Sequence, residues 1–467
     1  MSKNVDQSAF RDKVATVDKQ GKRVWVFPQK PKGWYYNART WLSVLYLIVF
    51  FGLPFVKVNG RPLFLLNILE RKFIIFGQIF WPQDFFIFGL SMILFIVFIA
   101  LFTVVFGRVF CGWVCPQTIF MEMVFRKVEY WIEGTANEQK RLAQQKWNKD
   151  KIFKKSMKWI VFWTISFLIA NTFLAYIIGI DELRIVISSP ISENLGGFIA
   201  LLIFTTIFFF VYTWFREQVC TVVCPYGRMQ GVLLDRDSII VTYDHVRGEE
   251  RGRFKKNEER TIGDCIDCNQ CVRVCPTGID IRNGTQLECV NCTACIDACD
   301  SIMESVGLPK GLIRYASESN ISENKPTRFT GRMKAYTAVM VVLLGVLTFL
   351  LMSRTNVDVA VLRSSGQLFQ KQPNDQISNL YNYKIVNKTY ADKILELRPE
   401  DFEGEIKYVG SQELKISKEE HATGSLFIFI DEDKIKKRKT ILKIGVYEDG
   451  KKIKTIETNF LGPFNKK

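Results

Sequence analysis

A run of 22 residues, from Phe85 to Phe106, carries no charged side chain and is almost wholly apolar. About 20 such residues in a helix cross the hydrocarbon core of a bilayer, which is roughly 30 Å thick. The chain holds four more runs of this character, so we predict a multi-domain membrane protein with five transmembrane α-helices. The predicted spans are Thr40–Val56, Phe85–Phe106, Trp159–Ile180, Gly196–Phe215 and Ala335–Met352.

One further apolar stretch, Pro62 to Trp81, differs from the five runs because charged residues interrupt its centre. Glu70, Arg71 and Lys72 lie there, and charge is expensive inside lipid. We interpret this stretch as interfacial and not as a span.

Lysine and arginine are distributed unevenly between the segments that separate the spans. The first 39 residues carry nine, residues 57–84 four, residues 108–158 eleven, residues 181–195 one and residues 216–334 seventeen. Loops rich in Lys and Arg stay on the cytoplasmic side. We therefore expect a multi-pass membrane protein with the N-terminus and the two basic loops cytoplasmic and the C-terminal domain exported.

The net charge of +16 follows mostly from this alternation. A basic protein of this kind raises nucleic acid as a partner, but no known binding module or aromatic-interleaved basic patch accompanies the charge. The lipid bilayer is the expected surroundings, and nucleic acid is not an expected partner.

The metal-ligating residues are skewed in kind, with 12 Cys against 2 His. Two His exclude a pair of bis-His haems and disfavour a multi-His zinc or iron site. Every Cys falls into a motif, and every motif lies on the predicted cytoplasmic side. The chemistry of the chain is therefore expected to be thiolate chemistry inside the cell.

Eight cysteines form two tandem runs. The first run is C-x2-C-x2-C-x3-C-P, the bacterial ferredoxin signature, and the second repeats the spacing without the proline. In two-cluster ferredoxins the fourth Cys of each run ligates the other cluster. We therefore predict one [4Fe–4S] cluster on Cys265, Cys268, Cys271 and Cys299, and another on Cys289, Cys292, Cys295 and Cys275.

Zinc is the competing use of these eight cysteines. A zinc knuckle needs pairs of C-x2-C separated by a longer finger and does not predict a third Cys at the same interval. The second run ends in Asp300 where the first has Pro276. Because proline is no ligand, this departure is expected to affect the local turn and the reduction potential of the cluster. It is not expected to affect cluster binding.

The remaining four cysteines form two C-x3-C-P motifs, each directly after a predicted span. Cys111 and Cys115 follow the second span, and Cys220 and Cys224 follow the fourth. If each helix continues past the lipid, both thiols of a pair lie on one face and the proline then ends the helix. Both spans run toward the cytoplasm, so the four thiols are expected at one membrane surface.

Three uses of these four thiols remain open from the spacing. They could bind copper as Cu(I), with thioether sulfur from Met121, Met123 or Met229 nearby. They could hold a further iron–sulfur cluster. They could form a dithiol pair that cycles with a disulfide, made more reactive by Arg108, Arg216 and Arg228. Buried cysteines that only pack are the alternative, which leaves the duplication of the motif unexplained.

The C-terminal tail has a different character. Short runs rich in β-branched and aromatic residues alternate with turn residues and predict an immunoglobulin-like β-sandwich without disulfides. The expected runs are Tyr383–Asn387, Glu405–Val409, Leu426–Ile430, Thr440–Tyr447 and Lys452–Glu457.

The predicted domain organisation follows from these segments. Residues 1–39 form a cytoplasmic N-terminal segment and residues 40–220 a four-span region. Residues 221–334 form a cytoplasmic loop that contains the ferredoxin domain at about 255–305. Residues 335–352 form the fifth span and residues 353–467 the exported β-sandwich.

These motifs together resemble the cytochrome c oxidase accessory protein family CcoG, also called FixG or RdxA. The resemblance rests on the C-x3-C-P pairs, the tandem ferredoxin runs, the segment Gly307–Ser317 and the C-terminal β-domain, and it spans essentially the whole chain. It implies a membrane polyferredoxin that supports assembly of cbb3-type cytochrome oxidase, with a role as a cupric reductase that supplies Cu(I). The implied partners are assembly factors of that oxidase or copper carriers.

Two other functions compete with copper reduction. One is a non-enzymatic assembly scaffold whose β-domain docks the oxidase. The other is a quinol-linked electron relay, since membrane polyferredoxins of anaerobic respiration are similar in their cysteine motifs, although they lack this β-domain. The electron donor stays open, because the chain has no nucleotide-binding glycine loop or flavin motif.

Overall fold

The computed structural model describes most of the chain between residues 15 and 463. The described ranges are 15–18, 20–58, 60–68, 72–80, 85–253, 262–324, 330–353, 357–366, 368–389, 391–410, 414–418, 420–435 and 437–463. The chain divides into two compact units, Met1–Leu347 and Thr348–Lys467.

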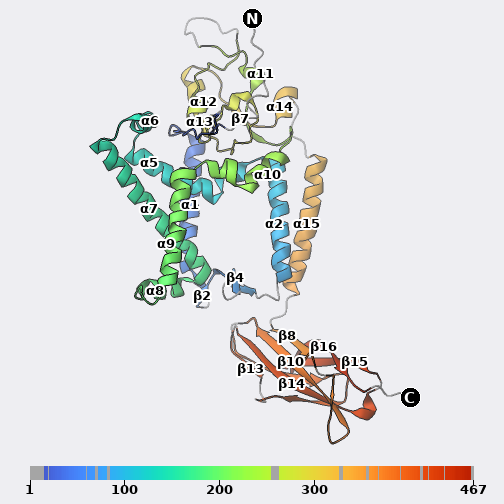
Figure 1. Ribbon diagram of the computed structural model, residues 1–467. Coiled ribbons are helices and arrows are strands. Elements are labelled where there is room, and N and C mark those ends of the chain that lie inside the picture. The colour runs from blue at the N-terminus through green and yellow to red at the C-terminus, as the bar shows by residue number, and fades with distance from the viewer. Residues whose placement is uncertain are drawn as a thin grey trace. The chain divides into compact units, whose positions relative to one another are not determined.

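Five helices of the described chain are long and apolar enough to cross a membrane (Figure 1). They are α1 (Trp34–Gly52), α2 (Phe85–Phe106), α7 (Lys149–Ile178), α9 (Leu195–Phe210) and α15 (Gly331–Met352), with α1 and α9 extended by helical turns to Phe55 and Phe215. Each contains one of the five predicted spans or most of it. The prediction of five apolar helices is confirmed, and they are consistent with a multi-pass membrane protein.

Hydrogen bonds and backbone geometry determine where these helices begin and end. At the start of α7, the Asn148 side chain accepts a hydrogen bond from the Lys151 backbone N–H at 2.8 Å, which satisfies a free donor of the first turn. The same helix ends at Gly179, whose φ of 89° is open to glycine. Asp297 takes the place of a cap for α1, because its carboxylate accepts hydrogen bonds from the backbone N–H groups of Tyr35 and Tyr36 at 3.1 and 2.7 Å.

The interrupted stretch between the first two spans forms a small antiparallel sheet and no helix. Its strands are β3 (Phe64–Asn67), β4 (Lys72–Ile75) and β5 (Gln78–Phe80). Leu65, Ile74 and Ile79 form its buried core. Glu70 and Arg71 lie outside the described residues.

Short elements between the longer helices complete the first unit. The strands are β1 (Lys57–Val58), β2 (Arg61–Pro62), β6 (Ile240–Tyr243) and β7 (Ile313–Ala316). The shorter helices are α3 (Val109–Trp113), α4 (Pro116–Thr118), α5 (Arg126–Ile132), α6 (Ala136–Gln144), α8 (Ile180–Ser188), α10 (Pro225–Leu233), α11 (His245–Gly248), α12 (Gln270–Arg273), α13 (Ala294–Ser305) and α14 (Glu318–Glu323).

The ferredoxin runs fold at one end of α1 (Figure 1). The two-stranded sheet of β6 and β7 closes this part of the chain by bringing Ile240 opposite Ala316. A buried core joins Val241 and Tyr243 of β6 to Met303 of α13 and to Leu312 and Ile313 beside it. The cysteine loops therefore pack against elements that come before them in the sequence and elements that come after them.

The second unit is a β-sandwich of two antiparallel sheets. One sheet has the order β12 (Gly404–Tyr408), β14 (His421–Asp431), β10 (Gln376–Asn387) and β8 (Val357–Arg363), with β9 (Gln370–Lys371) paired to β10. The other has the order β13 (Leu414–Ile416), β11 (Lys393–Pro399), β15 (Lys439–Glu448) and β16 (Lys451–Leu461). Alternate residues of both sheets, among them Ile385, Ile428 and Ile444, are fully buried between them.

Candidate metal centres

The first predicted cluster set lines one cavity. Cys265, Cys268, Cys271 and Cys299 all border it, together with Tyr243, Arg282 and apolar side chains. The thiols of Cys271, Cys268 and Cys265 act electrostatically on Cys299, which comes from α13 and not from the first run. The fold therefore brings the fourth cysteine of the second run to the first three cysteines, as the spacing predicts.

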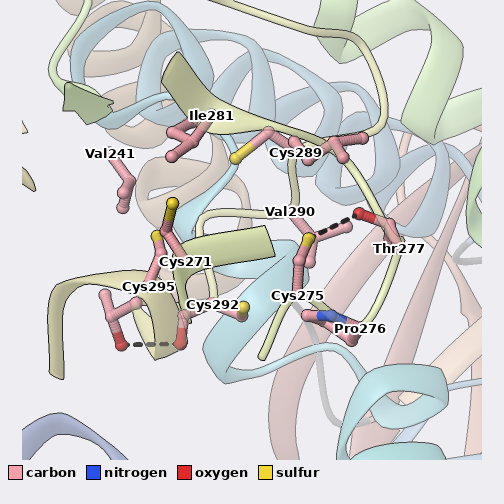
Figure 2. A pocket seen from close by; sticks show the side chains of 12 residues that line it. Val241, Cys271, Cys275, Pro276, Thr277, Ile281, Cys289, Val290, Cys292 and Cys295 are labelled. Atoms are coloured by element: carbon pink, nitrogen blue, oxygen red, sulfur yellow. Dashed lines mark hydrogen bonds between the residues drawn. The ribbon is translucent and has the colours of Figure 1, made fainter. Parts of the chain in front are cut away.

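A second cavity gathers the other predicted set. Figure 2 shows Cys275, Cys289, Cys292 and Cys295 around it, with Cys271 also on its wall. Electrostatic interactions join Cys295 to Cys292, Cys289 and Cys275 in that order of size. Cys271 borders both cavities, so the two sets lie side by side.

The backbone of both runs is strained at equivalent positions. The residues on either side of Cys268, Asp267 and Asn269, have φ of 54° and 58°. The residues on either side of Cys292, Asn291 and Thr293, have φ of 53° and 63°. Asn and Asp tolerate this left-handed region, but a β-branched threonine rarely adopts it. Strain of this kind persists where a site requires it, here to turn three thiols of one short loop inward.

Burial dominates the state of these thiols in the protein without bound metal. It raises the pKa of Cys271, Cys289 and Cys299 to about 12 and that of Cys292 to about 11. The backbone N–H groups of Thr277, Gly278 and Ile279 act in the opposite direction on the pKa of Cys275. A bound metal ion deprotonates a coordinating thiol outright, so these sites are built for a cationic group.

The arrangement fits a cubane cluster better than a single ion. No three His, Cys, Asp or Glu side chains of the described residues, those of the two C-x3-C-P motifs included, are grouped closely enough to hold one metal ion together. An iron–sulfur cubane instead takes one thiolate at each of four separate irons. Two cavities, each with four thiols on its wall, therefore fit two [4Fe–4S] clusters.

The C-x3-C-P motifs depart from the predicted continuous helix. After α2 the chain breaks at Gly107, with φ of 58°, and after the turn that follows α9 it breaks at Arg216, with φ of 52°. Cys111 then lies in α3 and Cys220 in a π-helical turn, Val219–Val223. The expectation of one uninterrupted helix through each motif is wrong, because both chains change direction before the first cysteine.

The prolines of these motifs begin helices and do not end them. Cys115 precedes α4 and Cys224 precedes α10, with Pro116 and Pro225 as the first helical residues. Proline is favoured at the first helical position because its fixed φ suits a helix. A backbone N–H at that position would have no partner within the helix, so the N–H that proline lacks is not missed. The Cys224 sulfur accepts a hydrogen bond from the Gly227 N–H at 3.4 Å.

All four thiols of the two motifs lie within electrostatic reach of one another. Cys220 interacts with Cys115, Cys111 and Cys224, although the two motifs are about 100 residues apart in the chain. The Cys111 thiol also donates a hydrogen bond to Gln230 Oε1 at 2.7 Å. We refer to Cys111, Cys115, Cys220 and Cys224 as the four-thiol site.

The expected activation of these thiols by neighbouring arginines is wrong for two of them. Burial raises the pKa of Cys111 to about 11 and that of Cys220 to about 12, and Arg108 offsets this only in part. Arg216 is engaged with Glu129, and Arg228 is exposed. Met121 packs in an aromatic core beside Phe120 and Phe125, and Met229 is exposed.

The four-thiol site and the second cluster set are in direct contact. Cys111 packs in one buried cluster with Val274, Val290 and Cys292. A side chain at Gly112 would collide with the Val290 carbonyl oxygen and the Asn291 backbone. The two loops thus touch through their backbones.

Arg39 joins the same two loops from the start of the first span. It is buried, and it donates hydrogen bonds to the carbonyl oxygens of Gly112 at 3.1 Å and Cys292 at 2.9 Å. Sequence reasoning missed Arg39 and Asp297, since each acts on a segment more than 70 residues away. An arginine at the edge of an apolar run carries no local sign of such a role.

A buried network of charges lies next to the four-thiol site. Glu129 on α5 receives two hydrogen bonds from Arg216, at 3.1 and 2.8 Å, and Lys158 of α7 lies 3.5 Å from it. Burial alone would raise the pKa of Glu129, but Arg216, Lys158 and Arg126 outweigh burial and hold the pKa below its ordinary value. The network ties α5, α7 and the turn after α9 together.

Models of known protein families match three segments of the chain. A 4Fe-4S binding domain matches residues 88–136 and a 4Fe-4S dicluster domain matches residues 215–318. The Ig-like fold found at the C-terminus of FixG matches residues 347–463. The fold and the sites therefore define an iron–sulfur protein with apolar helices and a C-terminal Ig-like domain.

Whole-chain relatives identify the family. Protein RdxA of Cereibacter sphaeroides is 32% identical over 427 residues, which cover 87% of this chain and 89% of RdxA. Protein RdxB of the same organism is 33% identical over 79% of this chain and 80% of RdxB. The nitrogen fixation protein FixG of Rhizobium meliloti is 29% identical over 80% of this chain and 79% of FixG. The chain belongs to the RdxA/FixG family, as its motifs predict.

The exchange of ligands between the two runs is testable with two serine variants. Cys275→Ser is expected to remove the cluster held by Cys289, Cys292 and Cys295, because its thiol lies in that cavity. Cys268→Ser, in the first run as well, is expected to remove the other cluster. Iron and sulfide analysis with EPR of the reduced protein measures both. Loss of the same cluster in both variants would contradict the assignment.

The charge network predicts a large cost for removing its central carboxylate. Glu129→Gln leaves the buried Arg216 without the carboxylate to which it is hydrogen-bonded, and Lys158 keeps only Glu133 at 2.9 Å. The variant is expected to lower the free energy of unfolding by ~3–5 kcal/mol. Denaturant unfolding in detergent measures it.

Glu304→Gln is the matched control for that variant, since Glu304 pairs with Lys310 on the surface at 3.0 Å. Its expected change in the free energy of unfolding is about 0–1 kcal/mol. Equal effects of the two variants would contradict a role for the network.

The contribution of Glu129 to stability depends on pH. Because the pKa of Glu129 is lowered in the fold, this contribution is present at neutral pH and is lost as the pH falls through that lowered pKa.

Proposed function

We propose that this protein carries electrons through two [4Fe–4S] clusters to the four-thiol site and there reduces Cu(II) to Cu(I), in support of cbb3-type oxidase assembly. The observation that carries the proposal is the backbone contact between Gly112 and Val290–Asn291. It brings a soft-ligand site against the loop of the second cluster, so that an electron need not cross an intervening layer of side chains.

The cavities assign the residues that would hold the clusters. Cys265, Cys268, Cys271 and Cys299 would hold the first, and Cys275, Cys289, Cys292 and Cys295 would hold the second, an assignment that the lining of the two cavities supports. When bound, such clusters accept and release single electrons at potentials set by charge, hydrogen bonds to sulfur and solvent access. Cys271 lies between the two sets, and the second set lies next to the four-thiol site.

Copper enters this scheme as substrate. One electron converts Cu(II) to Cu(I), and thiolate sulfur favours the reduced ion. Gln230 accepts the hydrogen bond of the Cys111 thiol at 2.7 Å and so orients it. Burial raises the pKa of Cys111 and favours its neutral form until a cation displaces the proton. The electrons come from a donor outside this chain, and the reduced copper is passed to copper carriers or oxidase assembly factors.

We further propose that all twelve cysteines face the cytoplasm of a bacterial inner membrane and that the Ig-like domain is periplasmic. The alternation of Lys and Arg between the loops supports this sidedness. Thiolate ligands are also protected on the reducing side of the membrane.

Removal of two thiols separates copper reduction from cluster binding. Cys111→Ser with Cys115→Ser is expected to abolish reoxidation of the dithionite-reduced clusters by Cu(II), because two of the four proposed ligands are gone. The EPR signals of both clusters are expected to persist, since their ligands lie elsewhere. Stopped-flow absorbance measures the reoxidation.

The matched control is Ser166→Ala, a small change inside the α7 span, away from all cysteine motifs. A double variant that reduces Cu(II) at the wild-type rate would show that electrons leave from an exposed cluster. No reoxidation by Cu(II) in the unmodified protein would favour the scaffold or the quinol-linked relay instead.

Reporter fusions test the sidedness. Fusions after Gly284 and after Pro463 are expected on opposite sides of the membrane, with the first cytoplasmic and the second periplasmic. Alkaline phosphatase and green fluorescent protein, which work on opposite sides, give the readout. Both fusions on one side would contradict the topology.

A further inference from the structure

Two arginines occupy corresponding places in the two halves of the membrane region. Arg108 and Arg216 each follow an apolar helix at the break in the chain and precede a C-x3-C-P motif by a few residues. Both are buried, with 1% and 3% of their surface exposed. A guanidinium is always charged, so each needs a compensating group inside the protein.

Among the residues that the structure describes, Arg216 has a carboxylate partner and Arg108 has none. Arg216 forms two hydrogen bonds to the Glu129 carboxylate and lies 3.6 Å from Glu217. No carboxylate of the described residues pairs with Arg108. Its Nη1 donates to the Leu287 carbonyl oxygen. Its Nε and Nη2 have no oxygen or nitrogen acceptor among the described residues, and the neighbouring side chain with which its guanidinium interacts is the Cys111 thiol.

The surroundings of Arg108 are sulfur and backbone. Its charge acts on the thiols of Cys111 and Cys220 in the four-thiol site and on Cys289 in the second cluster set. The bond to Leu287 anchors it two residues before Cys289. On its other side α10 approaches so closely that a Cβ on Gly227 would lie 2.9 Å from Nη2 and 2.6 Å from the Cys220 carbonyl oxygen.

We propose that Arg108 is the shared counter-ion of the second cluster and the four-thiol site, and that both carry net negative charge when their metals are bound. This inference rests on the proposed function for the metals but adds a role for a residue that ligates neither of them. A buried arginine without a carboxylate is compensated once thiolate sulfur surrounds it. Neutral thiols or a disulfide at the four-thiol site would leave that half of its surroundings uncharged.

The shared charge couples the two centres. A positive charge in a medium of low dielectric constant stabilises the reduced, more negative state of a nearby cluster. It also stabilises a metal held by thiolates at the four-thiol site. Arg108 is thus a positioning residue that makes both the second cluster and the four-thiol site better electron and metal acceptors.

The test is an EPR-monitored redox titration of the full-length protein with its clusters and without copper. Cys268→Ser first identifies which couple belongs to which cluster. Arg108→Gln is expected to lower the reduction equilibrium constant of the second cluster about tenfold, or about 59 mV for one electron, and to leave the first cluster unchanged. Arg228→Gln, an exposed charge on α10, is the control and is expected to change neither.

The lysine variant separates charge from packing. Arg108→Lys keeps the positive charge but loses the forked guanidinium group. The second cluster of this variant is expected to have a reduction potential close to that of the wild type. This comparison also decides the matter if Arg108→Gln does not assemble the second cluster. A tenfold lower reduction constant in Arg108→Lys, or an unchanged one in an assembled Arg108→Gln, would overturn the proposal.

A second measurement addresses the four-thiol site with Cu(I) alone as the probe. Competition with a chromophoric Cu(I) chelator is expected to show about tenfold weaker binding in Arg108→Gln than in Arg228→Gln. Equal affinity would overturn the shared role. Because neither measurement uses Cu(II) reduction, failure of the proposed function in the reoxidation assay is distinguishable from failure of this inference.

Discussion

The contact between the Gly112 backbone and the Val290–Asn291 backbone is the feature on which the arrangement of the sulfur sites depends. Two loops can approach this closely only where one of them lacks a Cβ, and any side chain at Gly112 would separate them. Arg39 then holds both loops through their carbonyl oxygens. The ferredoxin loops and the C-x3-C-P motifs therefore form one body of buried sulfur.

Burial of so many thiols imposes a balance of charge on the surrounding protein. Without metal, burial raises the pKa of thiols such as Cys111 and Cys289 and favours their neutral form. With metal, the thiolates need donors and cations, which backbone N–H groups, Arg39 and Arg108 supply on the side of the second cluster. Arg216, with the same position relative to its own motif, is instead paired with Glu129. The two halves of the membrane region thus use one residue type for two purposes.

Irregular backbone is concentrated around the four-thiol site. Three π-helical turns, Ile119–Phe125, Val211–Phe215 and Val219–Val223, occur in the described chain, and all lie within a few residues of a C-x3-C-P motif. Such turns are rare and are found mostly at functional sites. Together with the left-handed residues around Cys268 and Cys292, they show that the chain gives up regular structure where sulfur has to be positioned.

Much of the molecule follows from the sequence because the relevant physics is local. The five apolar helices are determined by uninterrupted runs long enough for a bilayer, and the β-sandwich by short alternating strands and turns. Strands β8, β9, β11 and β13 were not among the predicted runs, and β9 and β13 are only two and three residues long. The grouping of Cys299 with the first run and of Cys275 with the second could be predicted because the tandem spacing is that of two-cluster ferredoxins, in which the fourth cysteines exchange.

Tertiary structure decided what local patterns cannot contain. The breaks at Gly107 and Arg216 redirect each motif, so that the prolines begin helices where the sequence predicted that they end them. The electrostatic coupling of the four thiols, the placement of Arg39 and the lack, among the described residues, of a carboxylate paired with Arg108 depend on segments about 70 to 250 residues apart. Motif spacing determined which atoms can bind metal; only packing decided which charges and which backbone surround them.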